Sequence, residues 1–147
     1  MCIARSIDVF ATGLVAGVFL MGSFAVHPAA ARLDASSHVL LRQQLIQRLS
    51  KLMPPLMLLP VAACIIVFIF CRASVSWPIN TLACALSLAT VGITVAVNVP
   101  LNRCFARWSP GALPSNWQRL VRRWNAAHSA RTAIAVAAFV CAIFAGY

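Results

Sequence analysis

Charged residues are scarce in this sequence, and acidic residues are almost absent. Of the 147 residues only 10% are charged, and the two acidic ones are Asp8 and Asp34. Soluble domains carry about 25% charged residues, whereas here 62% of the residues are hydrophobic and the mean hydropathy is +0.89. This composition excludes an ordinary water-soluble domain, and the length suits one compact bundle.

Charge is missing altogether from four long stretches, residues 9–26, 52–70, 73–101 and 132–147. A helix spans a bilayer with roughly 20 mostly apolar residues, so these stretches predict four crossings. We expect an all-α, integral membrane four-helix bundle that forms a single domain over residues 1–147. The expected helices lie near 6–26, 52–70, 78–101 and 126–147, and the connections 27–51 and 102–125 carry short helical extensions.

Paired cysteines and acids within the apolar stretches are also lacking. The six cysteines form no C-x-x-C pair and no spacing typical of metal ligands, which disfavours a disulfide oxidoreductase and predicts no metal site. A proton-coupled transporter normally needs an acidic residue inside the membrane. Asp8 is expected at the outer membrane edge, where it would stay hydrated, so this class is disfavoured too.

The basic residues are distributed unevenly. Stretches 27–51 and 102–131 hold ten of the twelve, on the same side of a four-crossing chain. Basic residues are retained in the cytoplasm, so both termini are expected outside the inner (plasma) membrane and both long connections inside. The net charge of +10 is therefore interpreted as a topology signal. The expected partner is the lipid bilayer and not a nucleic acid.

Glycines and prolines predict local features of the helices. Gly13 and Gly17 form a G-x-x-x-G motif, which favours close contact with another helix of the same chain and leaves a homo-oligomer open. Pro28 is expected to end the first helix at His27. Pro54 and Pro55 should break or kink the second helix at the membrane boundary, and Pro100 should make its own turn irregular. Ser115-x-x-Gln118 predicts a capping box at the start of the last helix.

One face of the last helix gathers residues that could form a site. At about 100° per residue these side chains fall within an arc of roughly 80°. They are Trp117, Val121, Trp124, His128 and Arg131, with Asn125 at the edge. The three other arginines of this helix point the opposite way. Ordinary interpretations remain open, because the indoles fit an interfacial belt and Arg131 could snorkel from the bilayer edge.

Three further polar residues lie at the same depth of the predicted bundle. Asn98 and Asn102 are four residues apart on one helix face, and His27 ends the first helix. Asn98 could serve only a helix-to-helix hydrogen bond, and His27 could be a simple cap. An imidazole titrates near neutrality, however, so His27 and His128 are both candidate general bases. His38 has no comparable neighbours in the sequence.

Taken together, these motifs resemble a known family. Asn98-Val-Pro-Leu-Asn102 followed by Trp117 and Trp124-Asn125-x-x-His128-x-x-Arg131-Thr132 is similar to the anthrone oxygenase-like integral membrane family, also called domain of unknown function 1772. The four-crossing layout with a long third connection agrees. The resemblance carries over to Asn98, Pro100, Asn102, Trp124, His128 and Arg131, with a less specific counterpart for His27.

The resemblance implies a function that can be stated as chemistry. Some fungal relatives oxidise polyketide anthrones to anthraquinones with dioxygen and no obvious cofactor. The implied catalytic residues are His27, His128 and Arg131. The residues implied to bind a hydrophobic aromatic substrate are Asn98, Asn102, Trp117, Trp124 and Asn125. No cofactor is expected.

Two other functions remain open at this stage. One is a non-enzymatic membrane protein, such as an assembly partner or a small transporter subunit. The other is a b-type haem protein with His27 and His128 as axial ligands on facing helices.

Overall fold

The computed structural model describes residues 3–70 and 76–146, and four long helical rods run through them. The first rod comprises α1 (Ile3–Met21), the π-helical segment η1 (Gly22–Val26) and α2 (His27–Ala30). The second is α3 (Ala35–Phe70). The third comprises α4 (Trp77–Ile93), the π-helical segment η2 (Thr94–Asn98) and α5 (Val99–Phe105), and the fourth is α6 (Trp117–Gly146).

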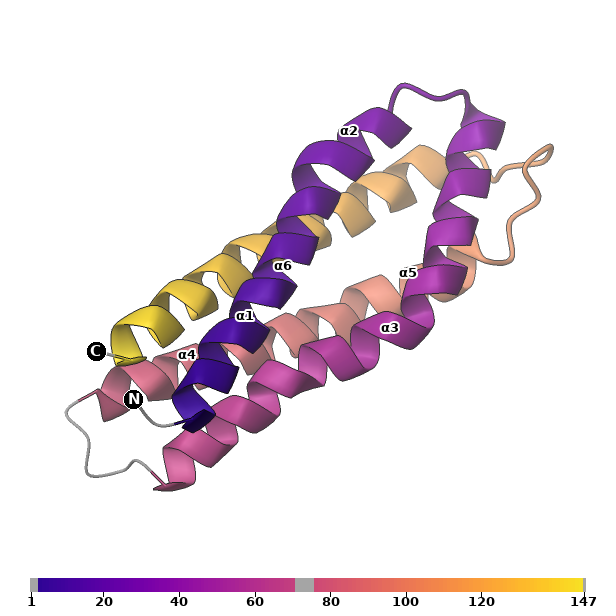
Figure 1. Ribbon diagram of the computed structural model, residues 1–147. Coiled ribbons are helices and arrows are strands. Elements are labelled where there is room, and N and C mark those ends of the chain that lie inside the picture. The colour runs from indigo at the N-terminus through magenta and orange to yellow at the C-terminus, as the bar shows by residue number, and fades with distance from the viewer. Residues whose placement is uncertain (1–2, 71–75, 147) are drawn as a thin grey trace.

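The rods pack side by side, and α1 begins at the end of the bundle where α6 finishes (Figure 1). The other end is built from α2, the first turns of α3, α5 and the first turns of α6, and we call it the α2 end. Apart from one isolated bridge between Ser109 and Ala112, the described residues form no β-structure. The predicted all-α four-helix fold is confirmed.

Side-chain polarity is inverted relative to a soluble protein. Large apolar side chains point outward, with Phe10 68% exposed and Phe24 78% exposed, while polar side chains such as Asn98 and His128 are buried. All four rods are long and apolar enough to cross a bilayer. Lipid solvates apolar surface and leaves polar groups to find partners inside the protein. The chain is therefore a membrane protein.

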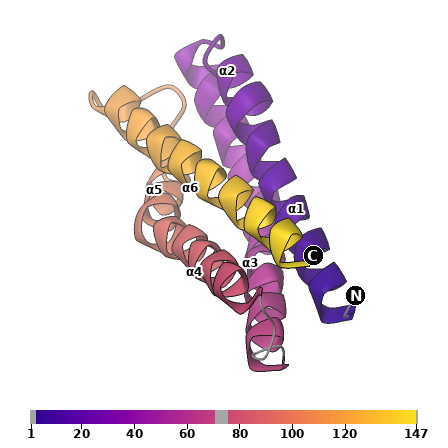
Figure 2. The ribbon, with the colours of Figure 1, turned by 90° about the vertical axis from the view of Figure 1, so that its left-hand side faces the viewer.

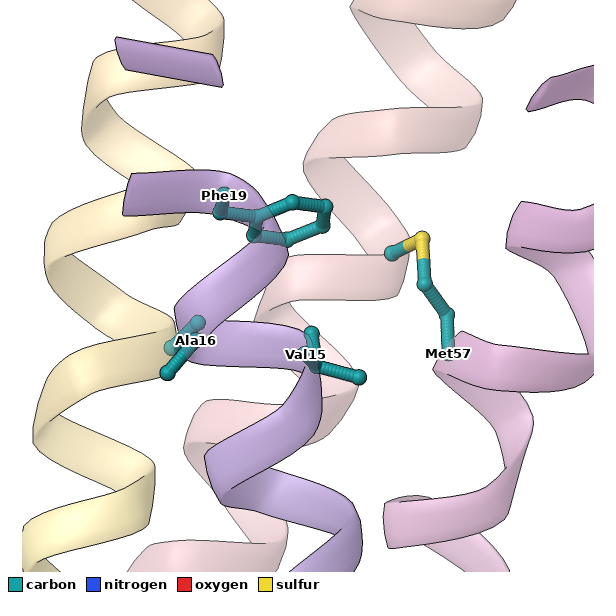
Figure 3. Close-up of a cluster of buried hydrophobic side chains, with 5 residues drawn as sticks. Val15, Ala16, Phe19 and Met57 are labelled. Carbon is teal, nitrogen blue, oxygen red and sulfur yellow. The ribbon is translucent and has the colours of Figure 1, made fainter. Parts of the chain in front are cut away.

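The bundle core is made of small side chains that let the helices approach closely. Buried alanines line the part of it nearer the end where α1 begins and α6 finishes: Ala11, Ala16, Ala63, Ala83, Ala135, Ala138, Ala142 and Ala145. Between them a cluster of Val15, Ala16, Phe19, Met57 and Ala135 joins α1, α3 and α6. Figure 3 shows Phe19 and Met57 reaching toward each other from α1 and α3. Close packing of this kind holds helices together where water exclusion is absent.

The G-x-x-x-G motif makes one of its two contacts within the chain. A Cβ on Gly13 would lie 2.8 Å from the Phe139 ring of α6, so α1 and α6 meet closely there. Gly17 is exposed, and a Cβ there would meet nothing within 4 Å. Gly13 thus follows the predicted contact inside the chain, whereas Gly17 faces away from it.

Prolines alter the helices without ending them. The helix α3 continues through Pro54, Pro55 and Pro60 and bends in its middle part, as Figures 1 and 2 show. The expected end of the first helix at His27 is wrong. The His27 amide donates to the Gly22 carbonyl in a wider π turn, and the helix runs on through Pro28 to Ala30.

The same device recurs in the third rod. The Val99 amide donates to the Thr94 carbonyl, so a π turn again comes directly before a proline, here Pro100. Proline lacks an amide donor and its ring crowds the carbonyl four residues back. A turn that is one residue wider relieves both problems. The irregular turn predicted at Pro100 is confirmed.

The ends of the helices follow partly predicted rules. The Asp34 carboxylate accepts the Ser37 amide at 3.0 Å and so caps α3. The hydrogen bonds from Ser37 also hold the pKa of Asp34 below its usual value. The capping box predicted at Ser115 and Gln118 is wrong, because α6 begins at Trp117 and, among the described residues, neither side chain bonds to the backbone amide of the other.

Asp8 also departs from expectation. It is 2% exposed rather than hydrated, and the Cys64 thiol donates to its carboxyl at 3.1 Å. The helix α1 begins five residues before Asp8, which places this side chain against α3 inside the bundle. An acidic residue therefore lies inside the bundle, so the expected lack of one no longer disfavours a proton-coupled transporter.

Packing at Gly13 gives a test of the fold. Gly13→Ala should lower the free energy of unfolding by about 1–3 kcal/mol, because the added methyl overpacks against Phe139. Gly17→Ala is the matched control, since it gains the same helix propensity without a contact. Thermal unfolding in detergent followed by circular dichroism measures both. Equal melting temperatures for the two variants would contradict the close approach of α1 and α6.

Candidate functional site at the α2 end

His128 on α6 is held by hydrogen bonds at both ring nitrogens. Its Nε2 lies 3.2 Å from the Phe19 carbonyl of α1, and its Nδ1 accepts from Arg131 Nε at 3.2 Å and from Arg131 Nη2 at 2.7 Å. A guanidinium has only donors, so Nδ1 must be an acceptor and Nε2 must carry the proton that bonds to Phe19. The ring, 4% exposed, is therefore fixed as one neutral tautomer.

Arg131 connects three rods from inside the bundle. Besides His128, its Nη1 donates to the Thr94 hydroxyl of η2 at 3.0 Å, and its guanidinium lies 4.5 Å from the centre of the Phe19 ring. Arg131 is 8% exposed, so it does not snorkel to the bilayer edge. All of these partners are uncharged, which leaves the positive charge available to a ligand.

Two further rings, those of His27 and Trp124, lie beside this pair. The His27 ring of α2 lies 4.4 Å from His128 and 5.1 Å from Trp124, edge-on to both, and Trp124 stacks on His128 at 5.2 Å and 9°. His27 is half-buried, and no hydrogen bond to its ring nitrogens is formed by the described residues. Of the two candidate bases, His27 alone has an unused nitrogen.

The two amides of the third rod anchor Trp124. Asn98 Nδ2 donates to the Trp124 carbonyl at 3.3 Å, and the Trp124 indole donates to Asn102 Oδ1 at 2.7 Å. Asn98 is 1% exposed, and its Oδ1 is buried with no partner. Asn98 thus makes the predicted helix-to-helix bond and still keeps one acceptor free.

The remaining two candidates lie at the rim of this group. Asn125 accepts a hydrogen bond from Arg42 Nη2 at 3.1 Å. Trp117 packs with His38, their rings 5.8 Å apart, rather than with His27 or His128. The structure therefore unites His27, Asn98, Asn102, Trp124, His128 and Arg131, brings Asn125 to their edge and leaves Trp117 one layer away.

Sequence reasoning missed Arg42 and His38. Both are buried on α3, with Arg42 8% and His38 6% exposed. The Arg42 guanidinium lies 4.7 Å from the centre of the Trp124 ring, and His38 Nδ1 bonds to the Ala30 carbonyl at 2.8 Å. The statement that His38 has no comparable neighbours is wrong. Their spacing of four residues, which puts both on one helix face, was the signal available.

The π segment η1 makes room for His128. A Cβ on Gly22 would lie 2.7 Å from His128 Nε2, so only glycine lets the imidazole approach this backbone. Next to it, Ser23 and Thr132 share a hydrogen bond of 3.0 Å, and the Thr132 hydroxyl donates to the His128 carbonyl. The irregular turn before Pro28 therefore carries two contacts to α6.

The geometry allows a metal site and a haem site to be assessed. Among the described residues no group of three or more His, Cys, Asp or Glu side chains is arranged to hold a metal ion. Haem ligation by His27 and His128 fits poorly, because an iron between two imidazoles needs metal–nitrogen bonds of about 2 Å on each side. Rings with centres 4.4 Å apart leave no room for it.

The Gly22 contact can be tested by substitution. Gly22→Ala should displace His128 and remove its bond to Phe19, with a loss of roughly 1–3 kcal/mol in unfolding free energy. Gly92→Ala, where a Cβ meets nothing within 4 Å, is the matched control. Thermal melts in detergent, together with the imidazole NMR signals of the purified protein, would reveal the change. Unchanged His128 signals in Gly22→Ala would contradict this placement.

Comparison with known proteins identifies the family of this chain. A family model described as Anthrone oxygenase matches residues 43–141, about two thirds of the 147 residues. The matched stretch contains Asn98, Trp124, His128 and Arg131, whereas His27 and Arg42 lie before it. Searches of curated proteins and of solved structures find no match. The chain is a member of the anthrone oxygenase family.

Proposed function

We propose that the protein is a membrane-embedded oxygenase that oxidises a polycyclic or phenolic substrate with dioxygen at the α2 end, without a cofactor. The observation that carries the proposal is the unused imidazole of His27, 4.4 Å from a His128 ring whose two nitrogens are both engaged. The family match over residues 43–141 supports the reaction class.

His27 is the general base in this proposal. His128 can take a proton only at Nδ1, and only if it gives up its bonds to Arg131. His27 has no such bond to lose, and its ring is half-buried and therefore reachable. His128 instead positions His27 and Arg131 by contact with both.

The reaction balances without a further reductant. His27 removes a proton from an acidic ring CH₂ of the substrate and leaves an enolate, which passes an electron to dioxygen and combines with the resulting superoxide. The peroxide takes the proton back from His27. Loss of water then turns the hydroperoxide into a carbonyl, so that CH₂ and O₂ become C=O and H₂O.

Arg131 and the amides stabilise the charge that forms in the enolate. A guanidinium has five N–H donors, and the hydrogen bonds of Arg131 to His128 and Thr94 use three of them. Two donors remain for an enolate oxygen, and fixed donors of this kind lower the barrier where charge develops. The Trp124 ring lies beside them, with its centre 5.6 Å from the Arg131 guanidinium.

This proposal predicts a specific loss of activity. His27→Ala should lower the rate of oxygen uptake with anthrone by about 10²- to 10⁴-fold, the usual contribution of a general base. Imidazole added to the buffer should restore part of that rate, which a purely structural role for His27 would not allow. Gln44→Ala, an exposed site on α3, is the control.

Two outcomes would contradict the oxygenase function. One is wild-type oxygen uptake no faster than spontaneous anthrone oxidation in the same detergent. The other is full activity in His27→Ala. A protein that fails the first test but still folds would favour the non-enzymatic alternative, an assembly partner or a transporter subunit.

We also propose that the protein spans the plasma membrane with its α2 end on the cytoplasmic side. Ten of the twelve basic residues lie in stretches 27–51 and 102–131, and such residues are retained inside. Alkaline phosphatase fused after residue 147 should therefore be active, because this enzyme matures only outside the cytoplasm. Green fluorescent protein fused at the same position should not fluoresce. An inactive phosphatase fusion together with fluorescence from the second fusion would show the opposite orientation.

A further inference from the structure

The α2 end holds two buried guanidinium groups without a carboxylate partner. Asp8 and Asp34 are the only acidic residues of the chain, and they are occupied by Cys64 and Ser37 respectively. No described residue gives Arg42 or Arg131 an ion pair, although both are only 8% exposed. Burying an uncompensated charge is costly, so proteins that do so bring a counter-charge from elsewhere.

Arg42 is the less satisfied of the two. Its Nη2 donates to Asn125, and its guanidinium lies over Trp124 at 4.7 Å and over Phe105 at 5.2 Å. Its Nε is buried and has no partner. Aromatic faces and one amide attract a cation but do not neutralise it. An unmade hydrogen bond at a buried charged donor points to a missing acceptor.

The contacts of Trp124 indicate which kind of molecule carries the missing acceptor. Arg42 and Arg131 both lie near its ring, at 4.7 Å and 5.6 Å, and Asn98, whose Oδ1 is also buried and unpaired, bonds to its backbone. Cationic donors, an acceptor and aromatic faces thus converge on one residue. An aromatic molecule with an anionic oxygen and a hydroxyl group would supply the acceptor that Arg42 Nε lacks and the donor that Asn98 Oδ1 lacks.

We propose that Arg42 and Arg131 bind the anionic oxygen of an aromatic substrate, as a phenolate, an enolate or a carboxylate, and that Arg42 sets the preference for charged substrates. The inference rests on the proposed function in that the ligand is the substrate of the same site. A guanidinium suits this role because its planar fork matches such oxygens. Arg42 precedes the stretch matched by the family model, which begins at residue 43.

A phospholipid headgroup offers the same charge at the membrane surface. A headgroup has no aromatic ring to lie along the ring cluster of His27, Trp124 and His128. An aromatic anion is therefore the better fit, and the experiment separates the two.

The test measures binding by quenching of tryptophan fluorescence in nanodiscs of zwitterionic phosphatidylcholine. The probes are anthracene-2-carboxylate and its neutral, equally shaped carboxamide. The wild type should bind the carboxylate about tenfold more tightly than the carboxamide, and Arg42→Gln should abolish that preference, which corresponds to about 1.4 kcal/mol. Arg48→Gln, an exposed arginine on the same helix, should keep it.

Controls keep the outcome interpretable. Arg42→Lys keeps the charge and should retain part of the preference, so it tests the site even if Arg42→Gln unfolds in a thermal melt. Equal binding of both probes by the wild type would overturn the proposal, as would an unchanged preference in a folded Arg42→Gln. Loss of carboxylate binding when phosphatidylglycerol replaces phosphatidylcholine would assign the site to lipid and overturn it too.

Failure of this inference differs from failure of the oxygenase function. A carboxylate preference that depends on Arg42, without oxygen uptake on anthrone, would uphold the anion site and reject the oxygenase. Oxygen uptake that is unchanged in Arg42→Gln, together with no carboxylate preference in the wild type, would uphold the oxygenase and reject the anion site.

Discussion

The organisation of the α2 end depends on the hydrogen bonds between Arg131 and His128. The guanidinium takes up the His128 Nδ1 lone pair, which places the ring proton on Nε2 and directs it to the Phe19 carbonyl of α1. The same guanidinium reaches Thr94 on the third rod. One cation thus sets a tautomer, joins three rods and leaves His27 as the neighbouring imidazole with a nitrogen to spare. Removing it would leave the buried Nδ1 of His128 without a partner and break the link to η2, where the Thr94 hydroxyl would keep its bond to the Thr90 carbonyl.

The site is polar because the bundle around it is apolar on the outside. Alanines and two close glycine contacts bring the helices together, while large side chains such as Phe10 and Phe24 are exposed on the outside. Polar groups in such a fold have partners only inside. At the α2 end these partners are neutral, so positive charge accumulates without an internal acid. A soluble protein would relieve that charge with water, whereas in this bundle the proposed anionic ligand would supply the counter-charge.

Features that follow from residues close together in the sequence could be predicted. Features that depend on packing between helices could not. The four crossings follow from charge-free stretches, and helical spacing alone brings Trp124, His128 and Arg131 to one face. Arg42 and His38 were missed, because their burial depends on how the start of α3 packs against α2, α5 and α6. Pro28 was expected to end a helix, and the π turn before it overrode that rule. Asp8 was assigned to water by its position in the chain, while packing against Cys64 buried it.

The two π turns have a consequence for how this fold tolerates insertions and deletions. Each turn contains one residue more than an α-helical turn, so everything beyond it is rotated by about 100° relative to a regular helix. His27 and Asn102 both lie beyond such a turn. Loss of a single residue from either segment would shorten the chain by less than 1% and still swing the following side chains away from Trp124. The site is thus encoded as much by residue count as by residue identity.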